Sequence, residues 1–309
     1  MNLRFICAQP AIPYYVWQVE VMINNFISMG IDPKNIDIVC WRVDGASEQW
    51  DKLVDCYKEV RFSFYNDTRE NRSYISSIRP NILKQHFLMY PNLEKEAIFY
   101  HDCDIAFTKP INWEQFLEDD KWYGSDCRWY IAHSYIKGKG EDVLDLMCNI
   151  AKIPKFLVEK NELNSIGAQY LMKGVNWRYW AEVEEDCEQM FKQVSELNRE
   201  KKRENPTYHE LQIWCADMWA VLWGAWKAGK ETVCHPDLEF SWATSTEADW
   251  DRLHIFHNAG VTGAEAGLFY KAQFMNKLPY NMPMELKEGS ASKKYWELIQ
   301  ETAKKSCLR

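Results

Sequence analysis

AIFYHDCDIAF, residues 97–107, contains the most informative segment of the sequence. Its first four residues are apolar or aromatic, as in a buried strand, and aspartates follow at positions 102 and 104. Residues two apart in an extended chain point to the same side. The pattern predicts a strand over 97–107 that presents Asp102 and Asp104 together and turns Cys103 toward the core.

Strand and helix patterns alternate upstream of this stretch. Short apolar runs predict strands at 3–8, 36–41 and 60–65, and apolar residues at helical spacing predict helices at 15–29, 47–57 and 77–90. Gly30 is the expected stop of the first helix. This alternation predicts an α/β fold: a Rossmann-like, mostly parallel sheet flanked by helices, with ligands at the carboxyl ends of its strands.

The second half of the chain is predicted to be rich in helix. Helical spacing marks 141–150 and 177–197, and TYHE at 207–210 has capping-box spacing that predicts a helix from Thr207 to about residue 228, stopped by Gly229. Strands are expected at 164–172 and 252–257, and the basic run 199–203 is expected to be a solvated stretch between helices. We expect a single domain over 1–309, with a nucleotide-binding half at 1–110 and an acceptor-binding half at 111–309.

Composition narrows the classes of partner and compartment. The 309 residues carry 45 acidic and 37 basic side chains, and the net charge of −8 gives no general attraction to nucleic acid or anionic membranes. No apolar stretch approaches the roughly 20 residues that cross a bilayer, and the first residues lack a secretory signal pattern. Ten scattered cysteines without a CxxC pair suit a reducing compartment, so a cytoplasmic location is expected.

Aromatic content is the one unusual value, at 15% with 15 Trp and 16 Tyr. Most of these rings are expected to fill the core. Exposed ones are candidates for stacking on a base or a sugar ring.

Asp102 and Asp104 are the first candidates for chemistry. Two carboxylates that converge at a sheet edge repel each other, and a divalent cation with oxygen ligands relieves this repulsion. A cation that also bridges a diphosphate neutralises charge on a leaving nucleotide, as sugar transfer requires. Two surface aspartates without a metal are the alternative interpretation, because Asp-x-Asp is a common pattern.

Three further candidates come from distant segments. His257, in HIFHNAG at 254–260, ends a strand-like run and is either a ligand of the same cation or a structural histidine. Lys271 is a candidate contact for phosphate oxygens as a point charge. Asp217 lies in the apolar stretch WCADMWAV at 214–221, where a carboxylate is either paired structurally or assists a reacting hydroxyl group.

HDCDIAF at 101–107, NSIGAQYLM at 164–172, WCADMWAV and FHNAG at 256–260 follow the motif order of type A glycosyltransferases. Over residues 3–275 the chain resembles most the hydroxyproline O-arabinosyltransferases and the peptidyl-serine galactosyltransferases. It departs from them at Asp217, where a glutamate is expected, and at residues 258–259, where an aromatic residue is expected. Those families mostly modify secreted proteins, and a microbial or viral origin would reconcile them with a cytoplasmic chain.

The resemblance implies a role for each motif. Asp102, Asp104 and His257 would hold Mn²⁺ or Mg²⁺, and Asp217 would be the catalytic or sugar-orienting carboxylate. The nucleotide-sugar donor, a UDP-sugar, would bind at Ala8, Gln9, Pro10, Arg79, Lys84, Asp102 and Lys271. The acceptor side would be formed by Gly167, Ala168, Gln169 and Trp219. The sugar would pass to a hydroxyl group of a protein or glycan, with retention of anomeric configuration.

Functions from other classes share the same carboxylates. They are a glycosyltransferase acting on hydroxylated DNA bases, a nucleotide-sugar hydrolase or nucleotidyltransferase, and a non-catalytic binding domain of the same fold. Phosphate-loop, dinucleotide-binding and Ser-His-Asp hydrolase functions are unsupported, because the sequence has no GxxxxGK[ST], no GxGxxG after the first strand and no GxSxG.

Overall fold

The structure is a computed structural model that describes residues 1–43, 48–264 and 267–308. The chain divides into two compact units, which we name after one element of each. The β1 unit comprises Leu3–Asn66, Tyr100–Gln115 and Pro236–Arg309, and the α8 unit comprises Met1–Asn2, Asp67–Phe99 and Phe116–His235. The predicted halves, in contrast, are contiguous in sequence, and the single domain stays a prediction.

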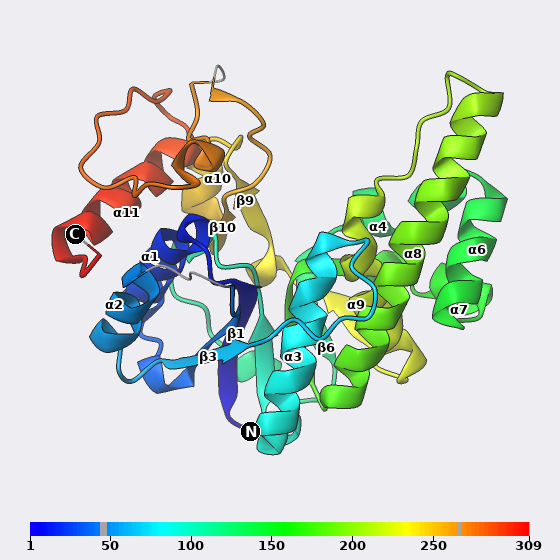
Figure 1. The fold of residues 1–309 in the computed structure, drawn as a ribbon, viewed down its shortest axis with the longest axis horizontal. Coiled ribbons are helices and arrows are strands. Elements are labelled where there is room, and N and C mark those ends of the chain that lie inside the picture. Colours follow the sequence, from blue (N-terminus) through cyan, green and yellow to red (C-terminus); the bar gives the residue numbers. More distant parts are fainter. Residues whose placement is uncertain (44–47, 265–266, 309) are drawn as a thin grey trace. The chain divides into compact units, whose positions relative to one another are not determined.

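The β1 unit combines parallel strands with helices. Its helices and strands are β1 (Leu3–Pro10), α1 (Pro13–Ser28), β2 (Ile36–Trp41), α2 (Glu48–Cys56), β3 (Arg61–Tyr65), β5 (Ile105–Phe107), β9 (Phe240–Trp242), α10 (Glu247–Arg252), β10 (Ile255–His257) and α11 (Ala291–Lys305). The strands β3-β2-β1 pair in parallel. A second sheet has the order β5-β10-β9, in which β10 runs antiparallel to β5 and parallel to β9. Figure 1 shows α11, in red, beside α1, in blue.

The start and the end of α1 follow from local sequence. Pro13 occupies the first turn, where its missing N–H has no helical partner to lose. Gly30 follows the last turn with a φ of 89°, and the N–H of Ile31 donates to the carbonyl of Phe26. This is a glycine cap in the left-handed region, so the predicted stop at Gly30 is confirmed.

The α8 unit carries most of the helices. Its helices and strands are α3 (Ile78–Met89), β4 (Ala97–Tyr100, whose last residue belongs to the β1 unit), β6 (Trp122–Asp126), α4 (Arg128–Ile131), α5 (His133–Lys137), α6 (Glu141–Ala151), α7 (Lys155–Lys160), β7 (Ile166–Lys173), α8 (Trp177–Glu204), α9 (Ala216–Lys227) and β8 (Thr232–Cys234). Its strands have the order β4-β7-β6-β8, with β6 antiparallel to β7 and parallel to β8. The long helix α8 packs against α3 and α9.

The predicted fold class is confirmed: it is α/β, with mostly parallel strands, flanking helices and a helix-rich second half. All ten cysteines are free thiols, and seven of them are buried. Among the described residues, no helix combines the length and the apolar character that a membrane span needs.

Several element boundaries differ from the predictions. The strand expected over 97–107 is two strands, β4 and β5, joined by a turn at 101–104. The helix expected from Thr207 begins only at Ala216, because the Thr207 hydroxyl donates to Asn205 and does not cap a helix. The basic run 199–203 lies within α8, and the strand expected from 252 begins at Ile255, because Arg252 ends α10.

Candidate metal and donor site

Asp102 and Asp104 lie in the turn between β4 and β5. Cys103 between them is buried, as predicted. The Asp104 carbonyl accepts from the N–H of Asn258 at 2.9 Å, and Nδ1 of His101 lies 2.8 Å from the Asp102 carbonyl oxygen. Burial lowers the pKa of His101 to about 4, so its ring is neutral and Nδ1 donates to that carbonyl. These bonds fix the backbone that carries the two aspartates.

The strand after the turn is held from two sides. The Asn25 amide of α1 bonds both backbone groups of Phe107: its Nδ2 donates to the carbonyl at 2.9 Å, and its Oδ1 accepts from the N–H at 2.7 Å. On the other side, β10 pairs with β5 so that His257 lies opposite Ile105, the residue after Asp104. This register, between segments about 150 residues apart, brings an imidazole to the two carboxylates.

Four side chains form a compact charged cluster, which we call the metal group: Asp102, Asp104, His257 and Lys271. Nε2 of His257 lies 3.5 Å from Asp102 Oδ2 and 3.4 Å from Asp104 Oδ1. The Lys271 ammonium pairs with Oδ2 of Asp104. The Asp104 side chain is 7% exposed and that of Asp102 is 30% exposed, so the group opens to solvent at Asp102.

The charges in the metal group stabilise one another. Burial by itself would raise the pKa of Asp104, but Lys271 and His257 hold it well below its usual range. Burial by itself would lower the pKa of His257, but Asp104 and Asp102 raise it to about 9. At neutral pH the imidazole is therefore protonated while no metal is bound. Trp242 of β9 stacks on the His257 ring, with centroids 6.2 Å apart and planes 9° from parallel, a contact that the sequence analysis missed.

The donor set fits a divalent cation. One ligand atom each from Asp102, Asp104 and His257 lie within 4.8 Å of one another. Carboxylate oxygens suit Mg²⁺ and Mn²⁺, and an imidazole nitrogen extends the choice toward transition metals. His257 would have to lose its proton to bind, and the cation would then replace that positive charge.

Three residues predicted to line the nucleotide pocket lie at the carboxyl end of β1, in the β1 unit: Ala8, Gln9 and Pro10. Ala8 and Gln9 are buried, and Pro10 is partly exposed. Nε2 of Gln9 donates to the Val39 carbonyl at 3.4 Å, while its buried Oε1 has no hydrogen-bond partner among the described residues. Within the same described part of the chain, the buried Nδ2 of Asn258 also lacks an acceptor. Buried amide groups without partners fit hydrogen bonds to a ligand.

Asp217 lies in the first turn of α9, within the α8 unit. The Tyr74 hydroxyl donates to Oδ1 of Asp217 at 2.7 Å and is 2.5 Å from the Trp214 carbonyl oxygen. Arg79, predicted for the donor, pairs with Asp217 Oδ2 at 3.7 Å. Burial and the Asp217 charge raise the pKa of Tyr74, so its hydroxyl stays a donor. Tyr74 carries no sequence signal, and only the fold brings it to Asp217.

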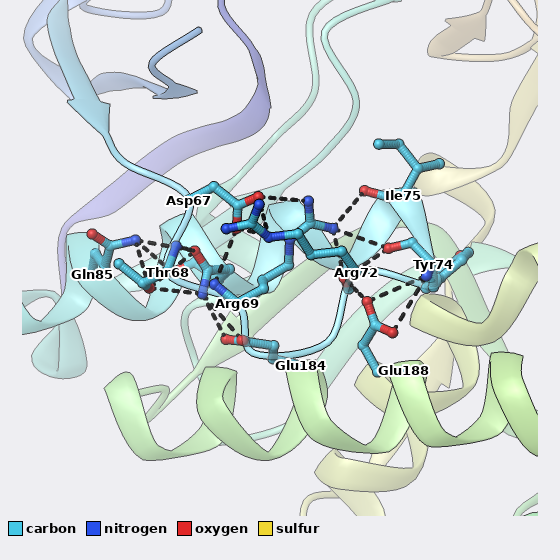
Figure 2. Close-up of polar contacts among 11 residues, drawn as sticks. Asp67, Thr68, Arg69, Arg72, Tyr74, Ile75, Gln85, Glu184 and Glu188 are labelled. Carbon is cyan, nitrogen blue, oxygen red and sulfur yellow. Dashed lines mark hydrogen bonds and ion pairs between the residues drawn. The ribbon is translucent and has the colours of Figure 1, made fainter.

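Tyr74 belongs to a larger polar cluster, the Tyr74 network, which comprises Arg69, Tyr74, Ser77, Glu188 and Asp217. Figure 2 shows Glu188, from α8, directed at Tyr74, whose N–H it accepts at 3.3 Å. Glu188 also accepts from the Ser77 hydroxyl. The buried Arg69 guanidinium donates to the Tyr74 carbonyl at 3.1 Å and to Ser77 at 2.9 Å. The network thus fixes the loop before α3 against α8.

Gly167, Ala168 and Gln169, predicted to shape the acceptor side, belong to β7 and are closely surrounded by other residues of the α8 unit. A Cβ on Gly167 would lie 2.6 Å from Met218 Cε, so this glycine makes room for a neighbouring side chain of the protein. Gln169 is buried, and its Oε1 accepts from the Ser125 hydroxyl at 2.6 Å. Ala168 between them has a φ of 58°, a strained left-handed conformation for an alanine.

Two other predicted site residues also have partners within the α8 unit. Trp219, predicted to bind substrate, is fully buried, and its indole N–H donates to the Ile131 carbonyl at 2.9 Å. In this structure the ring is part of the core of the α8 unit, and a substrate-binding role stays a prediction. Lys84, predicted for the donor, pairs with Glu184 at 2.6 Å.

Comparison with solved structures identifies the class of fold. The apo structure of WbbM, a bifunctional glycosyltransferase, matches with a TM-score of 0.51 and 10% identity over 98% of this chain. The chain spans about half of that protein, 49% of its length. The likeness shows that this chain has a glycosyltransferase fold, of the type A that the sequence predicts.

Two further glycosyltransferases are similar at lower scores. The galactosyltransferase LgtC, in complex with donor and acceptor sugar analogs, has a TM-score of 0.43 and 10% identity, over 97% of this chain and 96% of its own. Mouse xyloside xylosyltransferase 1, in its apo form, has a TM-score of 0.40 and 9% identity, over 84% of this chain and 98% of its own. No protein-family model matches the sequence, and no curated protein matches it either.

Proposed function

We propose that the protein is a metal-dependent glycosyltransferase that moves a sugar from a nucleotide-sugar, first of all a UDP-sugar, to a hydroxyl group of a protein or a glycan. The metal group carries this proposal: two carboxylates and an imidazole converge within 4.8 Å in a chain with a glycosyltransferase fold. The carboxylates already bind two protein cations, so the site is built to accommodate positive charge.

Each residue of the metal group would contact a different part of the nucleotide-sugar or its cation. A bound divalent cation would supply Lewis-acid stabilisation of the diphosphate. Asp102, Asp104 and His257 would hold that cation. Lys271, released from Asp104, would pair with a phosphate oxygen, and the unpartnered amide oxygen of Gln9 would accept from the nucleotide.

Asp217 would orient the reacting hydroxyl group. Its carboxylate is 15% exposed, and the Tyr74 hydroxyl fixes one of its oxygens while the other faces Arg79. We propose that transfer retains the anomeric configuration, as in the families that the sequence resembles. NMR of the product linkage measures this directly, and an inverted anomeric centre would rule it out.

The decisive experiment is a thermal-shift panel of UDP, GDP, CDP and their sugars, each with Mn²⁺, Mg²⁺ or a chelator. Ligands that bind the native state raise the melting temperature by mass action. We expect a shift with a uridine nucleotide that requires the metal, and Asp104→Asn should weaken this binding by about 100-fold or more, because a ligand contributes at least as much as the groups that orient it.

The matched control is Asp55→Asn, which removes an exposed carboxylate of α2 in the same unit. It should bind nucleotide and metal like the unmodified protein. An absence of any metal-dependent shift would leave Asp102 and Asp104 as ion-pair partners of His257 and Lys271 without a metal role, and would end the transferase proposal.

A further inference from the structure

The α8 unit contains a groove that none of the predicted site residues occupies. Its volume is about 770 Å³, within the roughly 300–1,000 Å³ of small-molecule sites. Its walls come from the second half of α8, the segment 208–214 that follows it, and α5. Four aromatic side chains line it: Tyr135, Phe191, Tyr208 and Trp214.

Trp214 is the ring of this groove that stays open. It is 61% exposed, whereas tryptophan is mostly buried in folded proteins. The other rings have partners: Lys139 lies over Tyr135 at 5.1 Å, and Phe191 stacks on Tyr74 with centroids 4.8 Å apart. Among the described residues, no ring or cation stacks on Trp214. Its indole is therefore available to a ligand.

The groove ends at Trp214, close in sequence to the proposed catalytic carboxylate. The Trp214 carbonyl and the Asp217 carboxylate share one donor, the Tyr74 hydroxyl. The two residues lie three positions apart, where the short helical turn Ile213–Cys215 leads into α9. A molecule stacked on Trp214 would therefore lie next to the turn that positions Asp217.

The charges of the groove argue against a nucleic acid. Three basic side chains and Glu210 line the groove, and each basic one has a partner. Lys139 lies over the Tyr135 ring, the Lys202 ammonium donates to the Tyr208 carbonyl at 2.9 Å, and Nε of Arg199 donates to the Ser195 carbonyl at 3.2 Å. The adjoining hollow on α8 is lined by three basic and three acidic side chains, so it has no net positive charge. Nucleic-acid grooves need an excess of positive charge along the backbone track. A neutral ligand with a flat apolar face fits this surface better.

We propose that this groove binds a carbohydrate acceptor, with a neutral sugar ring stacked on the Trp214 indole. The inference rests on the proposed function and deepens it, because it selects glycan over protein as the acceptor class. The C–H face of a pyranose packs on an aromatic face. His209, Glu210 and Gln212 of the same lining offer donors and acceptors to its hydroxyl groups.

The test is calorimetric binding of neutral hexasaccharides of glucose, galactose, mannose and xylose, without nucleotide or metal. We expect at least one of them to bind, and Trp214→Ala to weaken that binding about tenfold. The matched control is Trp129→Ala, which removes an indole that is 68% exposed on α4 of the same unit and lies outside the groove. It should leave the affinity unchanged, and Trp214→Phe should retain most of it. Equal unfolding midpoints would exclude a folding defect.

Three outcomes would overturn the proposal. The first is that no hexasaccharide binds at millimolar concentration, and the second is that Trp214→Ala and Trp129→Ala weaken binding equally. The third is that the groove binds another class of molecule in place of the saccharides, in a manner that depends on Trp214. That molecule would be a serine-rich or hydroxyproline-rich peptide, or a single-stranded DNA 20-mer whose binding weakens steeply with salt. Because no nucleotide or metal is present, a failure here leaves the donor site standing. A failure of the Asp104→Asn experiment, in turn, leaves the groove to this test.

Discussion

In the metal group the carboxylates face cationic side chains, whereas in the Tyr74 network Glu188 and Asp217 accept chiefly from hydroxyl and backbone N–H donors. A cationic partner can be exchanged for a divalent ion on the same oxygens. Hydrogen bonds from uncharged donors hold a carboxylate in one orientation. A buried donor or acceptor that loses its partner lowers the free energy of unfolding. The first cluster is suited to binding charge and the second to keeping a geometry.

Glu188→Gln is expected to have the largest effect, because it removes a carboxylate at the centre of the Tyr74 network. Glu188 is 4% exposed, and its replacement leaves buried donors of Tyr74 and Ser77 poorly satisfied. We expect the free energy of unfolding in urea to fall by about 2–3 kcal/mol. The control Glu185→Gln, at an exposed position of the same helix, should change it little. If Glu188→Gln left stability intact and instead abolished metal-dependent nucleotide binding, the structural role of the network would be wrong.

Metal binding at the metal group should depend on pH through His257. His257 has a pKa raised from 6.5 to about 9 in the metal-free protein and must lose its proton to bind a cation. Below pH 9, each bound metal should release about one proton, so affinity should rise about tenfold per pH unit and level off above pH 9. Titration calorimetry with Mn²⁺ between pH 6 and 9 measures this slope.

The raised pKa of His257 also makes the stability of the metal-free protein depend on pH, but stability falls as pH rises, whereas metal affinity increases. Because the folded-state pKa of His257 is raised, the stabilisation is complete below pH 6.5 and is lost as pH rises through 9. A metal affinity that does not change between pH 6 and 9 would remove His257 from the set of ligands.

Tyr74→Phe is expected to have the smallest effect. It removes the hydroxyl that joins Asp217 to the Trp214 carbonyl but keeps the ring that stacks on Phe191. One lost hydrogen bond to a partly buried group should cost about 1 kcal/mol in unfolding free energy. In an activity assay with an identified donor and acceptor, the turnover rate of Tyr74→Phe should fall while its affinity for metal and nucleotide stays unchanged. A loss of metal affinity instead would show that the two clusters do not act separately.

The alternation of strands and helices and the pairing of Asp102 and Asp104 with His257 could be predicted from sequence. Buried strands, glycine stops and the two-residue spacing of the aspartates are local patterns, and local patterns survive folding. The continuous strand over 97–107 was wrong because the polar residues 101–104 make a turn, held by backbone bonds to Ile6 and Asn258. The turn nevertheless brings both carboxylates to His257, because it leads into β5 opposite the end of β10.

The Tyr74 network and the Trp214 groove could not be predicted in the same way. Tyr74 and Asp217 are 143 residues apart in the chain, and no sequence pattern around Tyr74 predicts a hydrogen bond between them. The expected helix from Thr207 would have included Trp214, whereas the chain stays without regular structure through Gln212 and leaves that indole exposed. Trp219 shows the converse: its apolar neighbourhood in the sequence fits a core or a binding face, and in the structure its ring is fully buried and its indole N–H donates to the Ile131 carbonyl.

The pairing of β5 with β10 has a consequence for the synthesis of the protein. The metal group needs Asp104 and His257 together, and a ribosome adding roughly 5–20 residues per second would make them about 8–30 s apart. Until then the emerging chain carries the two aspartates without His257. Contacts of such long sequence separation form slowly. Competence to bind metal should thus appear only after the third segment of the β1 unit has left the ribosome and joined the first two.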